Sequence, residues 1–231
     1  MTVGPASEGS EFDGIPKQWW LRLGHDLRAP IAPIRLAVQL LRSGHGTPAE
    51  QQAALRLMDR QIDQLLADIE DISELARLNA GTFAFRPVAA DMNLVLDIVS
   101  GRSALGRTLE EKQQTLRCCP LASALAVNHD PARMVELLEF LVRKAAAHAV
   151  PGAVLTLELV ETSDQVNLRV TGAEKSLAAD PDLIHVTGSG PADVGELAAK
   201  ALVMREIARL SNVSFSLDEH AAIGMTLPAL R

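Results

Sequence analysis

The sequence predicts a chain of the α plus α+β class, in which a helical hairpin precedes an α/β sandwich. Two observations support this prediction. Over residues 18–81, apolar side chains recur at alternating steps of three and four, which is the spacing of packed helices. Over residues 82–231, short apolar runs of strand length alternate with helical segments. Residues 1–17 show neither pattern and are expected to form a disordered tail.

The hairpin is expected to contain two antiparallel helices. The first carries its apolar residues at Trp20, Leu23, Leu27, Ile31, Ile34, Val38 and Leu41. The stretch SGHGTPAE then ends it, and Thr47 caps the second helix, with Pro48 in its first turn and Glu50 completing a capping box. The second helix runs to Gly81, with apolar residues in heptads at Leu55, Met58, Ile62, Leu65, Ile69, Ile72 and Leu75 or Ala76.

A hairpin of two helices buries too little apolar surface to be stable alone. The heptad pattern of its second helix suits a partner helix. We therefore expect two copies of the chain to pair about a two-fold axis and form a four-helix bundle. The alternative is that the hairpin packs against the rest of its own chain.

The second domain is expected to pack helices on one face of a mixed or antiparallel sheet. Its helices are expected at residues 91–105, 131–149 and 196–210. Its strands are expected at residues 114–118, 124–128, 153–161, 165–172, 213–217 and 222–228. The polar, glycine-containing stretch 172–195 is too long and irregular for a single element and is expected to be a loop.

Charge and composition argue against several classes of protein. The formal net charge of −7 and the 3% aromatic content argue against binding of nucleic acid. No apolar run approaches the roughly 20 residues that span a membrane, and the N-terminus lacks a secretory signal, so a cytoplasmic protein is expected. The adjacent Cys118 and Cys119 are expected to be reduced, and no spaced cluster of histidines and cysteines predicts a metal site.

The stretch LGHDLRAPIAPIRLAVQLL carries the candidate reactive group. His25 lies two residues after the apolar Leu23, so its imidazole is expected to point to solvent. A carboxylate at Asp26 that holds the proton on one ring nitrogen leaves the other nitrogen free as a nucleophile. Pro30 and Pro33 remove backbone hydrogen bonds just beyond this site and are expected to bend or loosen the helix. The alternative is a surface histidine beside two incidental prolines.

This stretch resembles the phosphoacceptor box of bacterial sensor histidine kinases, whose usual form is His-Glu/Asp-Leu-Arg-Thr/Asn-Pro-Leu. The segment RQIDQLLADIEDISELARLNAG is similar to the second dimerisation helix of that family, and the order of elements after residue 82 resembles its ATP-binding domain. The resemblance covers about residues 18–229. It implies that His25 accepts a phosphoryl group, that Asp26 fixes the imidazole tautomer, and that Arg28 faces a partner or a phosphate.

The chain departs from the family at the positions that hold nucleotide. The family's asparagine motif, which coordinates magnesium, reads FLVRKA here with Phe140 and Lys144 at the asparagine positions, and an ammonium cannot ligate a cation. The Asp-x-Gly-x-Gly motif falls on Gly172 and lacks its aspartate. The later Gly-Leu-Gly-Leu box reads AAKA from Ala198 onward and includes Lys200. No nucleotide, metal or other cofactor is therefore expected on this chain.

The leading hypothesis is a dimeric histidine phosphotransferase that moves phosphoryl groups between receiver-domain aspartates through His25, without ATP. Its partners would be response regulator receiver domains, which supply magnesium, and an upstream histidine kinase. The expected docking face comprises Ala29, at the position of the family's Thr or Asn, with Ala32, Ala67 and Asp71. One alternative is a non-catalytic pseudokinase regulator that binds a kinase or response regulator. A second alternative is a divergent ATP-dependent histidine autokinase.

Overall fold

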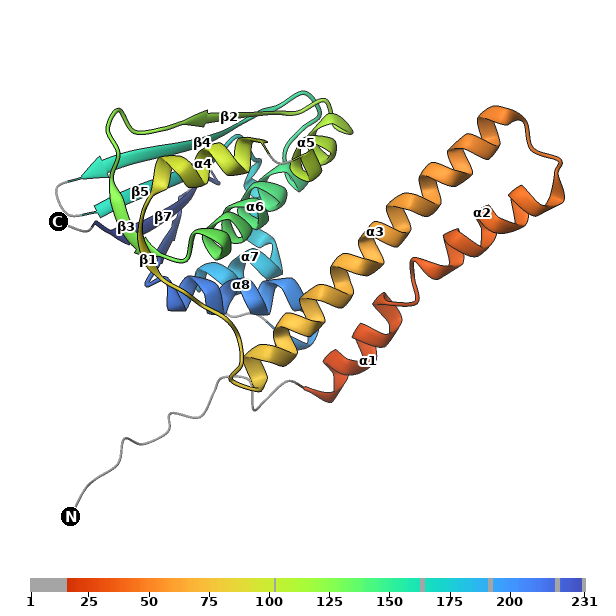
Figure 1. The fold of residues 1–231 in the computed structure, drawn as a ribbon, viewed down its shortest axis with the longest axis horizontal. Coiled ribbons are helices and arrows are strands. Elements are labelled where there is room, and N and C mark those ends of the chain that lie inside the picture. The colour runs from red at the N-terminus through yellow and green to blue at the C-terminus, as the bar shows by residue number, and fades with distance from the viewer. Residues whose placement is uncertain (1–15, 102, 163–164, 191–192, 219–220, 230–231) are drawn as a thin grey trace, which may run out of the picture. The chain divides into compact units, whose positions relative to one another are not determined.

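The computed structural model describes residues 16–101, 103–162, 165–190, 193–218 and 221–229 (Figure 1). The tail expected at residues 1–17 lies outside the described residues as far as residue 15, and the first helix begins at Lys17. Contacts within the chain divide it into two units. The first unit contains the residues up to Phe83 together with Asp193–Lys200, and the second contains Ala84–Ala192 and Ala201–Arg231.

The first unit contains the expected helical hairpin, in which α1 (Lys17–Asp26) and α2 (Ile31–Ser43) run antiparallel to the long α3 (Pro48–Asn79) (Figure 1). Gly44 ends α2 in the left-handed conformation, at φ 68°. The capping box at the start of α3 is confirmed. The Thr47 side chain accepts a hydrogen bond from the Glu50 N–H, and the Thr47 N–H donates to Glu50 Oε2 at 2.7 Å.

The expected first helix is interrupted, because the four residues that follow Asp26 form a turn. Pro30 has no N–H to donate to the carbonyl of Asp26. The Ile31 N–H then bonds the carbonyl of Arg28 at 3.1 Å, which is the shorter 3₁₀ spacing. The proline bend predicted from the sequence is thus a complete break, and α2 restarts the helix beyond it.

The apolar heptads of α3 are covered unevenly. Leu75 is buried, and Met58 is part-buried. By contrast, Leu55, Ile62 and Ile69, which are seven residues apart, are exposed by 45%, 41% and 47%. An apolar stripe of three residues, one heptad apart, therefore remains open on a single copy of the hairpin.

The start of the hairpin is held by Trp19 rather than by Trp20. Trp19 is 2% exposed, and its Nε1–H donates to the carbonyl of Leu197 at 2.9 Å. Leu197 directly follows the short 3₁₀ helix η2 (Val194–Glu196), which belongs to the same unit. Trp20 is 50% exposed and meets the Trp19 ring edge-on. Placing Trp20 in the buried seam was wrong, because the side of α1 that η2 covers carries Trp19.

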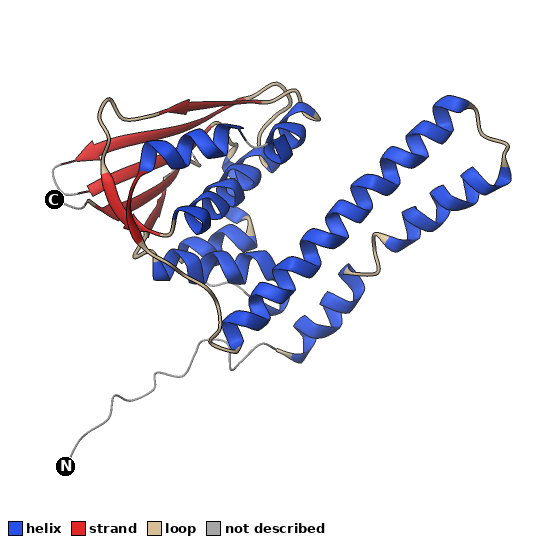
Figure 2. Cartoon of the chain, viewed as in Figure 1, coloured by secondary structure: helices blue, strands red, loops and turns tan. Residues whose placement is uncertain are grey.

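The second unit contains a five-stranded mixed sheet with helices on one face (Figure 2). The strand order is β2-β4-β5-β7-β6, in which β2 is parallel to β4 and the other pairs are antiparallel. The bounds are β2 Thr115–Cys119, β4 Val154–Thr162, β5 Gln165–Thr171, β6 Ser214–Leu217 and β7 Ile223–Pro228. A separate pair joins β1 (Val88–Asp91) to β3 (Ala126–His129).

The helices of this unit are α4 (Met92–Gly101), α5 (Ser103–Glu110), α6 (Pro131–Ala147), η1 (Lys175–Ala179), α7 (Pro181–Thr187) and α8 (Ala199–Leu210). Asp130 caps α6, its Oδ1 accepting the N–H groups of Ala132 and Arg133. Leu137 and Leu141 on α6 and Leu157 and Leu168 on the sheet are completely buried. This apolar layer between sheet and helices is the core expected of an α/β sandwich.

Two expectations for this domain were wrong in detail. The stretch 172–195 is not a plain loop, because η1 and α7 lie within it, η2 begins in it, and Asp180 caps α7 through the Leu183 N–H at 3.0 Å. The helix expected at 91–105 corresponds to α4 up to Gly101 and to the start of α5 from Ser103, and residue 102 lies outside the described residues. The strand β1 was missed, because its four residues are too few to show an alternating pattern.

Candidate functional site

His25 lies in the last turn of α1, and its side chain is 82% exposed. Its Nδ1 lies 3.3 Å from Oδ1 of Asp26. A carboxylate at this place keeps the proton on Nδ1 and leaves Nε2 as a free, solvent-facing nucleophile. The structure therefore brings together the imidazole and the carboxylate that the sequence singled out.

The turn after α1 is anchored on His25 itself. The His25 carbonyl accepts hydrogen bonds from the N–H groups of Arg28 and Ala29, at 2.9 and 3.1 Å. The Arg28 guanidinium folds back along α1, since a Cβ added at Gly24 would lie 3.7 Å from its Nη1. The Arg28 side chain thus lies beside Gly24, the residue that precedes His25.

The residues of the expected docking face differ in exposure. Ala29, Ala32 and Ala67 are exposed. Asp71 is part-buried and paired within the same unit, because its Oδ1 lies 3.0 Å from Nζ of Lys200. Burial raises the pKa of Asp71, and the Lys200 ammonium opposes that rise.

Asp68 on α3 is a neighbour of this site that the sequence reading did not single out. Burial raises the pKa of Asp68, a hydrogen bond from Gln64 opposes the rise, and the nearby charge of Asp26 adds to it. The bond from Gln64 Nε2 to Asp68 Oδ1 measures 2.8 Å. The sequence signal was the Gln-x-x-x-Asp spacing on one helix face, next to Ala67.

In the second unit, Lys144 on α6 is surrounded by acidic side chains. Its Nζ lies 3.1 Å from Asp180 Oδ1 and 2.6 Å from Asp182 Oδ2. His148, one turn later on α6, places Nε2 3.1 Å from Asp180 Oδ2 and Nδ1 3.1 Å from Ser176 Oγ. These contacts join α6 to η1 and α7. The side chains are mostly buried, since those of Lys144 and Asp180 are 21% and 10% exposed.

This network does not fit a magnesium–nucleotide site. Lys144, which the sequence resemblance places at an asparagine position of a magnesium motif, contacts both nearby carboxylates through its ammonium. Phe140, at the other asparagine position, is 7% exposed and offers a ring instead of an amide oxygen. Ligands for magnesium are oxygen atoms, and an ammonium supplies none.

The two glycine-motif positions also lack a phosphate cradle. Gly172 adopts φ 101°, and a Cβ there would lie 2.5 Å from the Val154 carbonyl oxygen, so this glycine permits close backbone packing against β4. The AAKA box begins at Ala198 and continues into α8, and its Lys200 is paired with Asp71. Sequence spacing gave no signal for that pair, because the two residues are distant in the chain.

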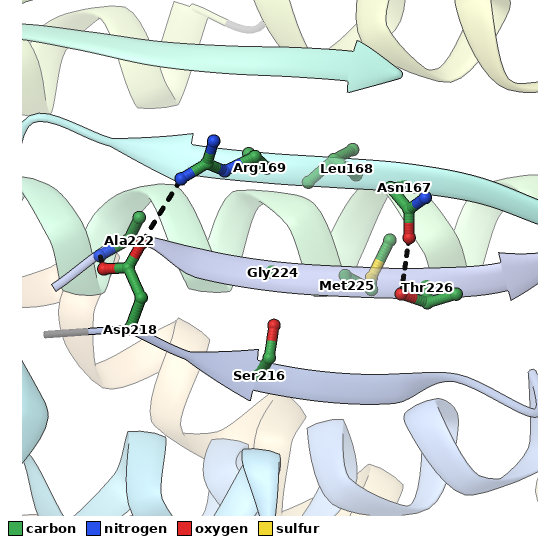
Figure 3. A pocket seen from close by; sticks show the side chains of 9 residues that line it. All are labelled: Asn167, Leu168, Arg169, Ser216, Asp218, Ala222, Gly224, Met225 and Thr226. Atoms are coloured by element: carbon green, nitrogen blue, oxygen red, sulfur yellow. Dashed lines mark hydrogen bonds and ion pairs between the residues drawn. The ribbon is translucent and has the colours of Figure 1, made fainter. Parts of the chain in front are cut away.

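A polar groove of about 290 Å³ lies over β5, β7 and β6 (Figure 3). An ion pair of 3.2 Å between Arg169 and Asp218 lies at one end, and a hydrogen bond of 2.7 Å from Thr226 Oγ1 to Asn167 Oδ1 lies at the other. A Cβ at Gly224 would meet Ser216 Oγ in its present rotamer, so Gly224 lets the Ser216 hydroxyl lie over the strand. The polar groups in these contacts satisfy one another.

The described residues contain neither a metal-binding cluster nor a membrane-spanning helix. Within the described ranges, no group of three or more His, Cys, Asp or Glu side chains is placed to hold a metal ion. Among the helices of that same part of the chain, none is long and apolar enough to cross a membrane.

Known proteins are similar to this chain over both units. The model of the His Kinase A (phospho-acceptor) domain matches residues 18–81, which include His25. The histidine kinase AdeS of Acinetobacter baumannii superposes over 89% of this chain and 96% of its own, with a TM-score of 0.64 at 17% identity. Residues 18–81 thus match a phospho-acceptor domain, and the chain shares its fold with solved histidine kinases. The histidine kinase ThkA, solved in complex with the response regulator protein TrrA, shares this fold with a TM-score of 0.63 at 12% identity, over 93% of this chain and 62% of that one.

The sequence relatives of this chain are longer proteins. A bacteriophytochrome of Pseudomonas aeruginosa is 27% identical over 74% of this chain and 23% of its own length. The sensor protein BasS of Escherichia coli is 25% identical over 62% of this chain and 38% of its length. The probable sensor histidine kinase TcrY of Mycobacterium tuberculosis is 26% identical over 67% of this chain and 31% of its own length. The chain thus spans less than two fifths of these relatives.

Proposed function

We propose that this histidine kinase core works as a phosphotransferase in two-component signalling. His25 takes a phosphoryl group from an aspartyl phosphate on one receiver domain and passes it to the aspartate of another. The observation that carries the proposal is a contrast between the units. The imidazole of His25 is 82% exposed and paired with Asp26, whereas Lys144 and two carboxylates fill the position of the magnesium motif.

The transfer step needs a nucleophile that is open to an in-line approach. The lone pair on His25 Nε2 attacks the phosphorus, the bond to the partner's aspartate oxygen breaks, and that aspartate leaves as a carboxylate. The proton on Nδ1 stays hydrogen-bonded to Asp26, whose negative charge stabilises the positive imidazole that forms. Arg28, in the turn that follows α1, is the cation that we assign to offset the charge of the phosphoryl oxygens. The reverse reaction delivers the group to the second receiver.

This chemistry uses no nucleotide on the chain. Magnesium, when it is required, is a ligand of the receiver domain. The partners are accordingly receiver domains of response regulators and an upstream histidine kinase that phosphorylates one of them, and both place the protein in the cytoplasm. The exposed Ala29, Ala32 and Ala67 beside the turn leave room for a receiver to approach His25.

The open stripe on α3 supports a homodimer. Leu55, Ile62 and Ile69 recur at the coiled-coil period and remain more than two fifths exposed in one copy. A second copy of the hairpin, packed about a two-fold axis, covers this stripe and completes a four-helix bundle.

The decisive experiment mixes the purified chain with a radiolabelled, phosphorylated receiver domain in the absence of ATP. We expect acid-labile label on the wild type and none on His25→Ala. The matched control is His45→Ala, which removes another exposed histidine of the hairpin and keeps the label. Label that arrives directly from ATP would establish an autokinase instead. Absence of label from every receiver, with signalling that survives His25→Ala, would establish a non-catalytic regulator.

A further inference from the structure

Arg22 makes a contact at this site that the phosphoacceptor motif does not include. It lies one helical turn before Asp26 on α1, and its Nε is 3.4 Å from Asp26 Oδ2. The other oxygen of the same carboxylate, Oδ1, is 3.3 Å from His25 Nδ1. One carboxylate therefore bridges a guanidinium and the imidazole, in the order Arg22, Asp26, His25.

Few features of the fold hold the Asp26 side chain in its orientation toward His25. It is the last residue of α1, and a carboxylate is disfavoured at a helix C-terminus by the helix dipole. The chain leaves the helix directly after it, so no following helical turn packs against it. Across the hairpin, the Asp68 carboxylate carries the same charge, and its pKa is raised in part by Asp26.

Charged and polar side chains face Asp26 from α1, from α3 and from the turn that follows α1. Arg22 and His25 face it from α1, Asp68 faces it from α3 with Gln64 bonded to it, and Arg28 lies in the adjoining turn. The Arg22 guanidinium contacts Oδ2 of Asp26, and His25 contacts the other oxygen, Oδ1.

We infer that Arg22 is a positioning residue for the phosphoacceptor. It fixes the Asp26 carboxylate so that His25 keeps its proton on Nδ1 and presents an unprotonated Nε2. Arg22 touches neither the phosphoryl group nor the reacting nitrogen. The inference rests on the proposed function, because the free Nε2 matters only if His25 is the phosphate carrier.

Stability alone does not account for this contact. The Arg22 and Asp26 side chains are 45% and 52% exposed, and an exposed ion pair contributes little to folding. The order of charges is also the less favourable one for a helix, with the cation preceding the anion. A purely structural pair would leave the protonation pattern of His25 unchanged when it is removed.

The test compares Arg22→Gln and Arg22→Lys with the wild type. The control is Arg35→Gln, which removes another exposed arginine of the same hairpin. The first measurement is the share of the Nδ1–H tautomer of His25, from the nitrogen and carbon NMR shifts of its ring at about pH 8, where imidazole is neutral. The second measurement is the rate of phosphoryl transfer from a receiver domain.

We expect Arg22→Gln to lower the share of the Nδ1–H tautomer and to slow the transfer step about three- to tenfold, with half-saturation by the receiver unchanged. Arg22→Lys should keep most of the Nδ1–H tautomer and most of the transfer rate, since an ammonium can still hold the carboxylate. The inference is overturned if Arg22→Gln leaves the tautomer ratio unchanged, or if Arg35→Gln shifts it equally. Should the wild type accept no label while the tautomer still depends on Arg22, the proposed function fails and the positioning of the imidazole stands.

Discussion

The Nζ of Lys144 lies 2.6 Å from Oδ2 of Asp182, which ties α6 to α7. Asp180 joins the same ammonium and caps α7. Burial alone would raise the pKa of Asp180, but the Leu183 N–H, the Lys144 ammonium and His148 outweigh burial and lower it. Asp180 therefore keeps its charge in the folded protein, and the segment that holds η1 and α7 is fixed by contacts within the chain.

Removing the ammonium should loosen this segment. Lys144→Ala leaves two part-buried carboxylates without their cation, and we expect the free energy of unfolding to fall by about 1–2 kcal/mol. Hydrogen exchange should increase across residues 174–187. The control, Lys175→Ala, removes an exposed lysine on η1 and should change neither quantity. Equal behaviour of the two variants would show that the ion pairs do not hold the segment.

A second prediction concerns the indole of Trp19. Trp19→Phe keeps most of the ring but loses the donor to the Leu197 carbonyl, which should cost about 1 kcal/mol of stability. Trp19→Ala also loses the buried ring and should cost about 3 kcal/mol. Urea denaturation measures both values, and hydrogen exchange at residues 193–200 reports whether the segment loosens.

Trp20→Ala is the matched control, because Trp20 is half exposed and contributes mainly its edge contact with Trp19. It should cost less than half as much as Trp19→Ala. If the two alanine variants are equally unstable, the contact with residues 193–200 is not what holds the start of α1.

A third prediction follows from His129, which is completely buried at the end of β3. Burial lowers the pKa of His129, and backbone groups of Asp130 and Ala90 oppose the shift only in part. The folded protein therefore keeps His129 neutral at a pH where the unfolded chain binds a proton. Stability is fully present above about pH 6.5 and falls by up to about 1.4 kcal/mol per pH unit below it.

The comparison of His129→Leu with the wild type isolates this effect. Between about pH 6.5 and the lower pKa of the folded state, the leucine variant should lose less stability than the wild type on acidification. His45→Ala, at an exposed histidine of the hairpin, should keep the steeper wild-type profile. Parallel profiles for His129→Leu and the wild type would contradict the assignment of a neutral, buried His129.

Sequence patterns predicted the features that depend on neighbouring residues. The capping box at Thr47 and Glu50, the proline break after His25 and the heptads of α3 are all local, and the structure contains each of them. Sequence patterns did not predict α7. Its start carries the same signal as that of α6, an N-cap aspartate followed by proline, at Asp180 and Pro181. A helix of seven residues is too short to show periodicity, so the cap was the only available sign.

The remaining features depend on pairs that are remote in the sequence. Lys200 reaches Asp71, and Trp19 bonds Leu197, because residues 193–200 pack on the hairpin. No repeat or motif relates these positions. The burial of Trp19 instead of Trp20 was unpredictable for the same reason, since periodicity along α1 alone cannot reveal which face a distant segment covers.

The last prediction tests the proposed homodimer through the open stripe on α3. Ile62 lies at its centre, 41% exposed, with Leu55 and Ile69 one heptad to either side. Covering the exposed two fifths of Ile62 contributes about 1 kcal/mol, a two-fold dimer gains this twice, and a glutamate at this place also buries two carboxylates at a cost of at least about 1 kcal/mol.

Ile62→Glu should therefore weaken the dimer by at least about 3 kcal/mol, or roughly a hundredfold in dissociation constant. Light scattering coupled to gel filtration should find a dimer for the wild type and a monomer for this variant at micromolar concentration. Val160→Glu changes an apolar residue of similar exposure on the sheet of the second unit, and it should remain dimeric. The far-ultraviolet circular dichroism of all three proteins checks that their helices persist. A wild type that is monomeric at these concentrations, or an Ile62→Glu variant that stays dimeric, would show that this stripe is not the dimer interface.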